Sequence, residues 1–154
     1  MHVRLLFFLG ITFLMFSLGC KKETTSDWAY CQDCAASVWV GNYEGNGDYF
    51  SESSSEQLIN TPVEIRVEQL SDTRIKFYVL APDLYEASFT ATKNDNYYYI
   101  NLAGSSSSLI ANLTQNDAQN RLTGTAKHYH YVYTAIDTTL VIDHSLSFEV
   151  ISTD

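Results

Sequence analysis

The sequence predicts an all-β protein in which about eight antiparallel strands form a meander closed into a small barrel, with a two-sheet β-sandwich as the alternative. Residues that favour strands are abundant, including 11 Tyr and 8 Phe. Apolar and polar residues alternate with period two after residue 38, which is typical of half-buried strands. Turn-forming residues separate these runs at short intervals, and no convincing helical period follows residue 38. Closure would also pair the edges that an open sheet leaves exposed.

A hydrophobic N-terminal segment precedes this domain. Arg4 supplies a basic start, and the apolar run from Leu5 to Leu18 is followed by small residues. These are the three parts of a secretory signal peptide. The run is also shorter than the ~20 residues that a helix needs to cross a bilayer. We therefore interpret residues 1–19 as a cleaved signal peptide.

The last residues of this segment are Ser17-Leu18-Gly19-Cys20. They resemble the lipobox of bacterial lipoproteins, in which the cysteine becomes the lipid-bearing N-terminus. The resemblance implies lipidation of Cys20 and attachment to the outer membrane of a bacterial cell envelope, on its periplasmic or its surface face. A non-lipidated export signal is the alternative.

Residues 20–37 are interpreted as a tether that carries a cysteine pair. Lys21 to Asp27 is short, polar and charged, as expected of a spacer. In an exported protein, Cys31 and Cys34 predict a disulfide. The same C-x-x-C spacing occurs in zinc and redox sites, which are the alternatives. Trp28 to Ser37 is expected to form a short turn or helix around the pair.

The domain spans residues 38–154, and its first strand, Val38 to Phe50, combines two kinds of residue on one face. That face carries Trp39, Gly41, Tyr43, Gly45, Gly47 and Tyr49, whereas the other face is polar. Glycines between large rings suit a strand that bends sharply. The serine-rich stretch from Phe50 to Asn60 is expected to be a polar loop, either a connector or a lid.

Seven further strands are predicted from alternation between turns rich in Asp, Asn, Gly, Pro and Ser. They are residues 61–69, 73–79, 84–92, 97–102, 109–114, 121–134 and 139–152.

An early aromatic-glycine strand, a long loop and an eight-strand meander are together similar to small lipocalin-like (calycin) barrels. The resemblance extends over residues 38–152 and lies in this pattern. It implies a barrel interior that holds a small or hydrophobic ligand. We expect Trp39, Tyr43, Phe77 and Phe89 to ring such a pocket.

Three histidines are the most distinctive polar residues of the domain. His128 and His130 lie two apart, so that both face the same side of a strand, and His144 lies on the apolar face of the next one. With a three-residue loop at Ile136 to Thr138, His130 would lie opposite His144. We therefore add the three histidines to the predicted ligand pocket. A zinc site and hydrogen-bonded packing inside the barrel are the alternatives.

The charge and the missing motifs exclude several classes of function. The formal net charge is −9, and an acidic domain repels nucleic acid, so no nucleic-acid partner is expected. The sequence contains neither Gly-x-Ser-x-Gly nor His-Glu-x-x-His. Asp143 and His144 are strand neighbours, so their side chains are expected to point to opposite faces. No catalytic residue, cofactor or resident metal is therefore expected.

Two functions agree with these observations. The first is a non-enzymatic, lipid-anchored envelope protein that binds a small or hydrophobic ligand inside the barrel. The second is an envelope protein–protein interaction module, such as a protease or lysozyme inhibitor. An exposed aromatic surface would favour the second, and the stripe of Tyr129, Tyr131 and Tyr133 is a candidate for it.

Overall fold

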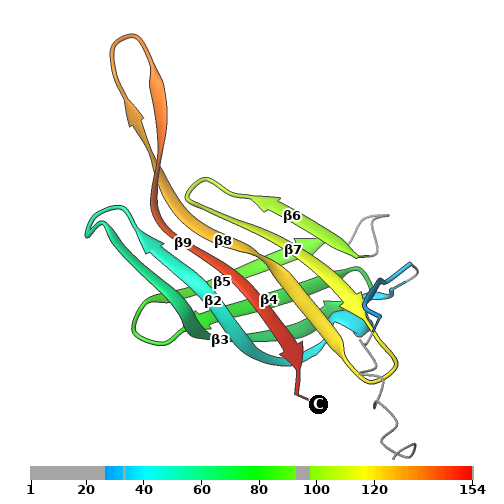
Figure 1. Ribbon diagram of the computed structural model, residues 1–154. Coiled ribbons are helices and arrows are strands. Elements are labelled where there is room, and N and C mark those ends of the chain that lie inside the picture. Colours follow the sequence, from blue (N-terminus) through cyan, green and yellow to red (C-terminus); the bar gives the residue numbers. More distant parts are fainter. Residues whose placement is uncertain (1–26, 33, 93–97, 154) are drawn as a thin grey trace, which may run out of the picture.

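The computed structural model describes residues 27–32, 34–92 and 98–153 (Figure 1). The predicted signal peptide and Cys20 lie outside these residues. The described chain forms one antiparallel sheet of nine strands and a short 3-10 helix. The elements are β1 (Ala29–Tyr30), η2 (Ala36–Trp39), β2 (Gly41–Ser51), β3 (Glu56–Ser71), β4 (Arg74–Ala81), β5 (Tyr85–Thr92), β6 (Tyr99–Ala103), β7 (Ser107–Gln115), β8 (Asn120–Tyr133) and β9 (Thr138–Ser152). Over this part of the chain, no helix combines the length and the apolar character needed to cross a bilayer.

The strand order confirms the predicted all-β class and the antiparallel meander. Neighbouring strands follow the order β1-β7-β8-β9-β2-β3-β4-β5, and β6 also pairs with β7. Two runs of consecutive hairpins, β2 to β5 and β6 to β9, are therefore joined by the pairing of β9 with β2. Between the described residues of β5 and β6 there is no ladder of paired residues.

The sheet folds back over itself, and the core lies inside the fold. Strands β3 to β5 pass behind β7 to β9 in Figure 1. One hydrophobic cluster draws buried side chains from both runs, and its largest members are fully buried. The indole of Trp39 packs edge-on against Phe77, with ring centroids 6.0 Å apart. Burial of each large apolar side chain contributes roughly 1.5–3 kcal/mol to the stability of the fold.

Two glycines of β2 allow the backbone of β9 to approach closely. Gly45 lies opposite Val150, and Gly47 lies opposite Phe148. A methyl group at Gly45 or Gly47 would collide with a carbonyl oxygen of β9. Small residues at these positions are therefore required by the neighbouring backbone, in addition to the bend predicted from the sequence.

The prediction of a polar loop from Phe50 to Asn60 is wrong. β2 continues to Ser51, β3 begins at Glu56, and a four-residue turn connects them. The pairs Tyr49↔Leu58 and Ser51↔Glu56 extend the hairpin to this turn. Leu58 packs against the core, so the stretch has one inward apolar residue that its many serines concealed.

The N-terminal segment is attached to the sheet next to the β7–β8 turn. β1 pairs with the end of β7, where Ala29 lies opposite Gln115. The sulfurs of Cys31 and Cys34 are in disulfide contact, with Cα atoms 5.7 Å apart, consistent with the predicted disulfide. Arg121 at the start of β8 lies over the ring of Trp28, with Cζ 4.5 Å from the ring centroid. The tether therefore meets the domain at the end of the sheet where β8 begins.

Candidate functional site

Strands β8 and β9 extend beyond their neighbours as a hairpin that stands clear of the body (Figure 1). β7 pairs with β8 only as far as His128, and β2 pairs with β9 only as far as His144. Beyond these residues the two strands pair with each other, and among their described backbone groups only the N–H of Tyr129 and the carbonyl of Asp143 still bond to the body, at Ser106 and Glu52. We call residues 130–143 the projecting hairpin.

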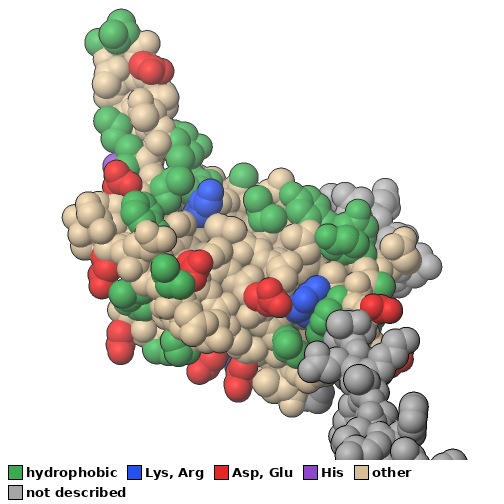
Figure 2. Space-filling model, viewed as in Figure 1, with side chains coloured by type: hydrophobic (Ala, Val, Ile, Leu, Met, Phe, Trp, Pro, Cys, Tyr) green, Lys and Arg blue, Asp and Glu red, His purple; other side chains and the backbone are tan. Residues whose placement is uncertain are grey.

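The projecting hairpin exposes large apolar side chains. Ile136 at the tip is 97% exposed and Tyr133 is 75% exposed. Five of the twelve exposed large hydrophobic residues in the described chain belong to it: Tyr131, Val132, Tyr133, Ile136 and Leu140. Figure 2 shows hydrophobic side chains at its tip and along its length. Residues 130–143 contain no Lys or Arg. An exposed apolar patch of this kind is typical of an interaction surface.

Hydrogen bonds hold the projecting hairpin in one conformation. At its turn, the backbone N–H of Thr134 donates to the carbonyl of Asp137 at 2.8 Å, and the Thr134 hydroxyl donates to the same oxygen at 3.0 Å. At its base, His130 Nδ1 lies 2.8 Å from a carboxylate oxygen of Asp143. These contacts pre-organise the hairpin, which lowers the entropic cost of binding.

A stripe of tyrosines lies along one face of β8. Tyr129 is buried, and its hydroxyl donates to the carbonyl of Gly104 at 2.6 Å. Its ring meets that of Tyr131 edge-on, with centroids 6.0 Å apart, and Tyr131 lies 6.4 Å from Tyr133. The stripe runs from a buried, hydrogen-bonded tyrosine to an exposed one near the tip.

A second polar group gathers at the base of the hairpin, and we call it the His–Tyr cluster: Tyr49, Tyr85, His128 and His144. His128 lies directly opposite His144 in the β8–β9 ladder. The hydroxyl of Tyr49 is 2.8 Å from His144 Nδ1. The ring of Tyr85 stacks on that of His128, with centroids 4.8 Å apart. The cluster joins side chains of β2, β5, β8 and β9.

Two groups of the His–Tyr cluster have shifted pKa values. Burial raises the pKa of Tyr85, whose hydroxyl has no hydrogen-bond partner within the described structure. Burial also lowers the pKa of His128; the positive charge of His144 lowers it further, whereas Asp143 opposes the shift. A neutral imidazole is therefore favoured at His128.

The prediction that His130 lies opposite His144 is wrong. Val141 lies opposite His130, and His144 pairs with His128 instead. The register shifts at this point because β9 has one extra residue, Asp143, between the partners of His128 and Tyr129. The connection also comprises the four residues 134–137 rather than the three expected. As a result, His130 lies on the projecting hairpin, outside the His–Tyr cluster.

The aromatic residues of the predicted ligand pocket are core residues. Trp39, Tyr43, Phe77 and Phe89 are all buried in the single hydrophobic cluster. The hydroxyl of Tyr43 donates to the carbonyl of Trp39 at 2.9 Å. These side chains pack against one another and do not gather with the three histidines.

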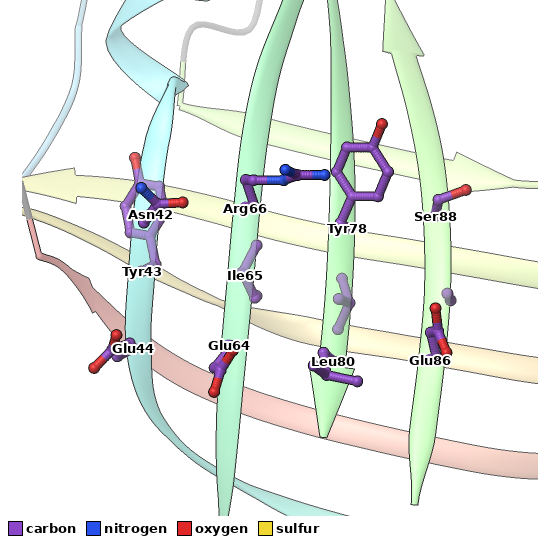
Figure 3. Close-up of a pocket in the computed structure, with 12 residues that line it drawn as sticks. Asn42, Tyr43, Glu44, Glu64, Ile65, Arg66, Tyr78, Leu80, Glu86 and Ser88 are labelled. Atoms are coloured by element: carbon purple, nitrogen blue, oxygen red, sulfur yellow. The ribbon is translucent and has the colours of Figure 1, made fainter. Parts of the chain in front are cut away.

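A hollow lies on the outer face of β2 to β5 (Figure 3). It is an open groove of about 730 Å³. Glu44, Glu64, Leu80 and Glu86 form one row across the four strands, since each lies opposite the next. In the neighbouring row, Arg66 reaches toward Tyr78, with Cζ 4.4 Å from the ring centroid. The sequence analysis did not identify this groove.

No metal-binding group emerges from the described residues, where no three His, Cys, Asp or Glu side chains are arranged to hold an ion. Comparison with protein-family models, curated proteins and solved structures gave no match to this chain. The function is therefore argued from the geometry alone.

Sequence reasoning missed Tyr49 and Tyr85 as partners of the histidines. Both were placed on inward faces by the alternation of their strands. What the alternation does not specify is the pairing of β2 with β9, or the stacking of a β5 side chain on β8. Both contacts depend on chain segments that are far apart in sequence.

Proposed function

We propose that this protein is a lipid-anchored, non-enzymatic component of a bacterial cell envelope that binds a partner protein through the projecting hairpin. The observation that carries this proposal is the exposure of Tyr131, Tyr133 and Ile136 on a rigid hairpin that stands outside the body of the domain. A partner that covers these exposed apolar side chains removes them from water, which contributes a favourable free energy of binding.

The packed core favours a protein-interaction module over a protein that binds a hydrophobic ligand inside the barrel. Trp39, Phe77 and Phe89 contribute to one packed cluster, and none of them lines a described hollow. A small polar ligand at the His–Tyr cluster is the second candidate, favoured by the unpartnered hydroxyl of Tyr85. Added mass in a native mass spectrum of the mature protein would support this candidate.

The position of the tether supports a contact away from the anchoring membrane. The tether meets the domain beside the start of β8, and the projecting hairpin includes the other end of the same strand. At about 3.3 Å per residue, the 14 residues of β8 separate these ends by roughly 45 Å. With Cys20 lipidated, the hairpin would therefore extend from the side of the domain opposite the lipid.

We also propose that the sheet closes as a small barrel. Tyr85 at the start of β5 stacks on His128 of β8, which brings the two runs of hairpins into side-chain contact. The pairing of β9 with β2 joins both runs in one continuous sheet, which also favours a barrel over a sandwich of two separate sheets. Hydrogen-exchange protection of the β5 edge would support closure.

Site-specific photo-crosslinking in the cells that produce the protein tests the hairpin contact. A benzophenone side chain replaces Leu140, which is 44% exposed on the hairpin, or Leu70, which is 48% exposed near the β3–β4 turn. We expect a covalent adduct with another protein from position 140 and none from position 70. Equal adduct yields from the two positions, or none at position 140, would contradict the proposed function.

A further inference from the structure

The edge of β8 has unpaired backbone groups along the projecting hairpin. The N–H of Tyr129 donates to the carbonyl of Ser106 at 2.9 Å, which is the last bond on that side. Because backbone groups alternate in direction along an antiparallel strand, the N–H and C=O of Tyr131 and Tyr133 point to the same side as the N–H of Tyr129. No described strand lies there, since β7 ends its pairing at His128.

This edge also has none of the features that usually prevent strand pairing. Natural edge strands are protected by lysines, prolines, bulges or a covering segment. Residues 130–142 contain no Lys, Arg, Pro or Gly. The register shift lies at the base, between His128 and Tyr129, and the ladder beyond it is regular to Tyr133↔Thr138. The edge is therefore a regular template for another strand.

We propose that an extended segment of the partner protein adds to the β8 edge of the projecting hairpin as a further strand, in line with β7. This inference rests on the proposed function and specifies its mode of binding. Backbone hydrogen bonds to Tyr131 and Tyr133 would supply the register, and side chains on one face would contact the tyrosine stripe.

The chemistry of the edge indicates the kind of segment that it binds. A segment of four or five residues covers the free part of β8. β-branched or aromatic residues at alternate positions suit cross-strand contacts with Tyr131 and Tyr133. The hairpin carries Asp137 and Asp143 but no Lys or Arg, and the whole chain has a net charge of −9. The segment is therefore neutral or basic, because an acidic one would be repelled.

A second copy of this chain fits the edge less well. Two copies would bring together two chains of net charge −9. Two residues of each β8 offer free backbone groups, whereas stable interfaces bury about 800 Å² on each partner. A crosslinked adduct of twice the mass of the protein would reveal this occupant and overturn the proposal.

Proline substitutions on the two edges of the projecting hairpin test the proposal. Each variant also carries a benzophenone side chain in place of Ile136 at the tip, and the yield of the crosslinked partner adduct is measured. Tyr131→Pro removes an outward N–H of β8 and leaves the β8–β9 ladder in place, since proline is tolerated on free edges. Thr138→Pro is the matched control, because Thr138 lies opposite Tyr133 on the other edge, and its N–H donates to the side chain of Asp137 rather than to β8. Thermal unfolding of both variants checks the fold.

We expect Tyr131→Pro to lower the yield of the partner adduct by at least about fivefold, since one backbone hydrogen bond is lost and the ring obstructs the edge. Thr138→Pro is expected to keep the yield within about twofold. If Tyr131→Pro gave the same adduct yield as the protein without the proline, strand addition at β8 would be overturned, while the proposed function would stand. Loss of adduct from both variants, or from Thr138→Pro alone, would also overturn it. The absence of any adduct from position 136 or 140 in the otherwise unchanged protein would instead refute the proposed function.

Discussion

At the scale of single residues, His128 lies at the base of the projecting hairpin in surroundings that disfavour its protonated form. His128 stacks on Tyr85 and lies opposite His144, which is bonded to Tyr49. Burial is the main cause of its lowered pKa, and His144 adds to the shift. A second positive charge beside a protonated His144 would be unfavourable at this short cross-strand distance.

The stability of the fold is expected to decrease as the pH falls below the ordinary histidine pKa of 6.5. The unfolded chain binds the proton of His128 more readily than the folded chain, so a falling pH favours unfolding. The stabilising contribution is complete above 6.5 and is lost as the pH falls through the lowered pKa of the folded state. Urea unfolding from about pH 7.5 to about pH 5 measures this effect. His128→Gln should reduce the pH dependence, and an unchanged dependence in that variant would contradict the assignment to His128.

At the scale of elements, β2 depends on close contact between its glycines and β9. Gly47→Ala would place a methyl group against the carbonyl oxygen of Ser147. We expect this change to lower the free energy of unfolding by about 1–3 kcal/mol, because the two backbones must separate. Gly104→Ala is the control, since its methyl group would lie 3.1 Å from the Ser107 carbonyl. Urea unfolding should show the smaller loss for Gly104→Ala, and equal losses would contradict the role of Gly47.

The strands were predictable where local alternation determines which side chains are buried. Residues 61–69 lie within β3, and all but the first residue of the predicted strand 73–79 lies within β4, because one face of each carries apolar residues at every second position. The stretch after Phe50 was not predictable, since Leu58 is its one apolar residue that packs on the core. The extra residue in β9 could not be predicted from the sequence either, because a register shift depends on the partner strand. The same shift moved His130 out of the predicted site.

At the scale of the whole molecule, the tether and the projecting hairpin lie at opposite ends of β8. This arrangement agrees with a domain held to a membrane at one end and binding at the other. If Cys20 carries the proposed lipid, the hairpin would lie at the end of the domain away from the anchor.

Cys20→Ala is expected to release the protein from the membrane. Without the thiol, no lipid can be attached, and the hydrophobic energy of about 0.8 kcal/mol per buried CH₂ is lost. Detergent phase partitioning should move the protein from the detergent phase to the aqueous phase. Cys31→Ala is the matched control and should stay in the detergent phase. Equal partitioning of the Cys20 variant and the unchanged protein would exclude the proposed anchor.

The projecting hairpin contributes little to the core, and this has a consequence for how the protein can evolve. Residues 130–143 lie outside the hydrophobic cluster, so the loss or gain of residues at the tip leaves the interior unchanged. Insertions or deletions of two residues in each strand preserve both the pairing of the remaining residues and the face to which each side chain points. The length and sequence of the tip can therefore diverge under selection for new partners, while the sheet beneath it is conserved by its packing.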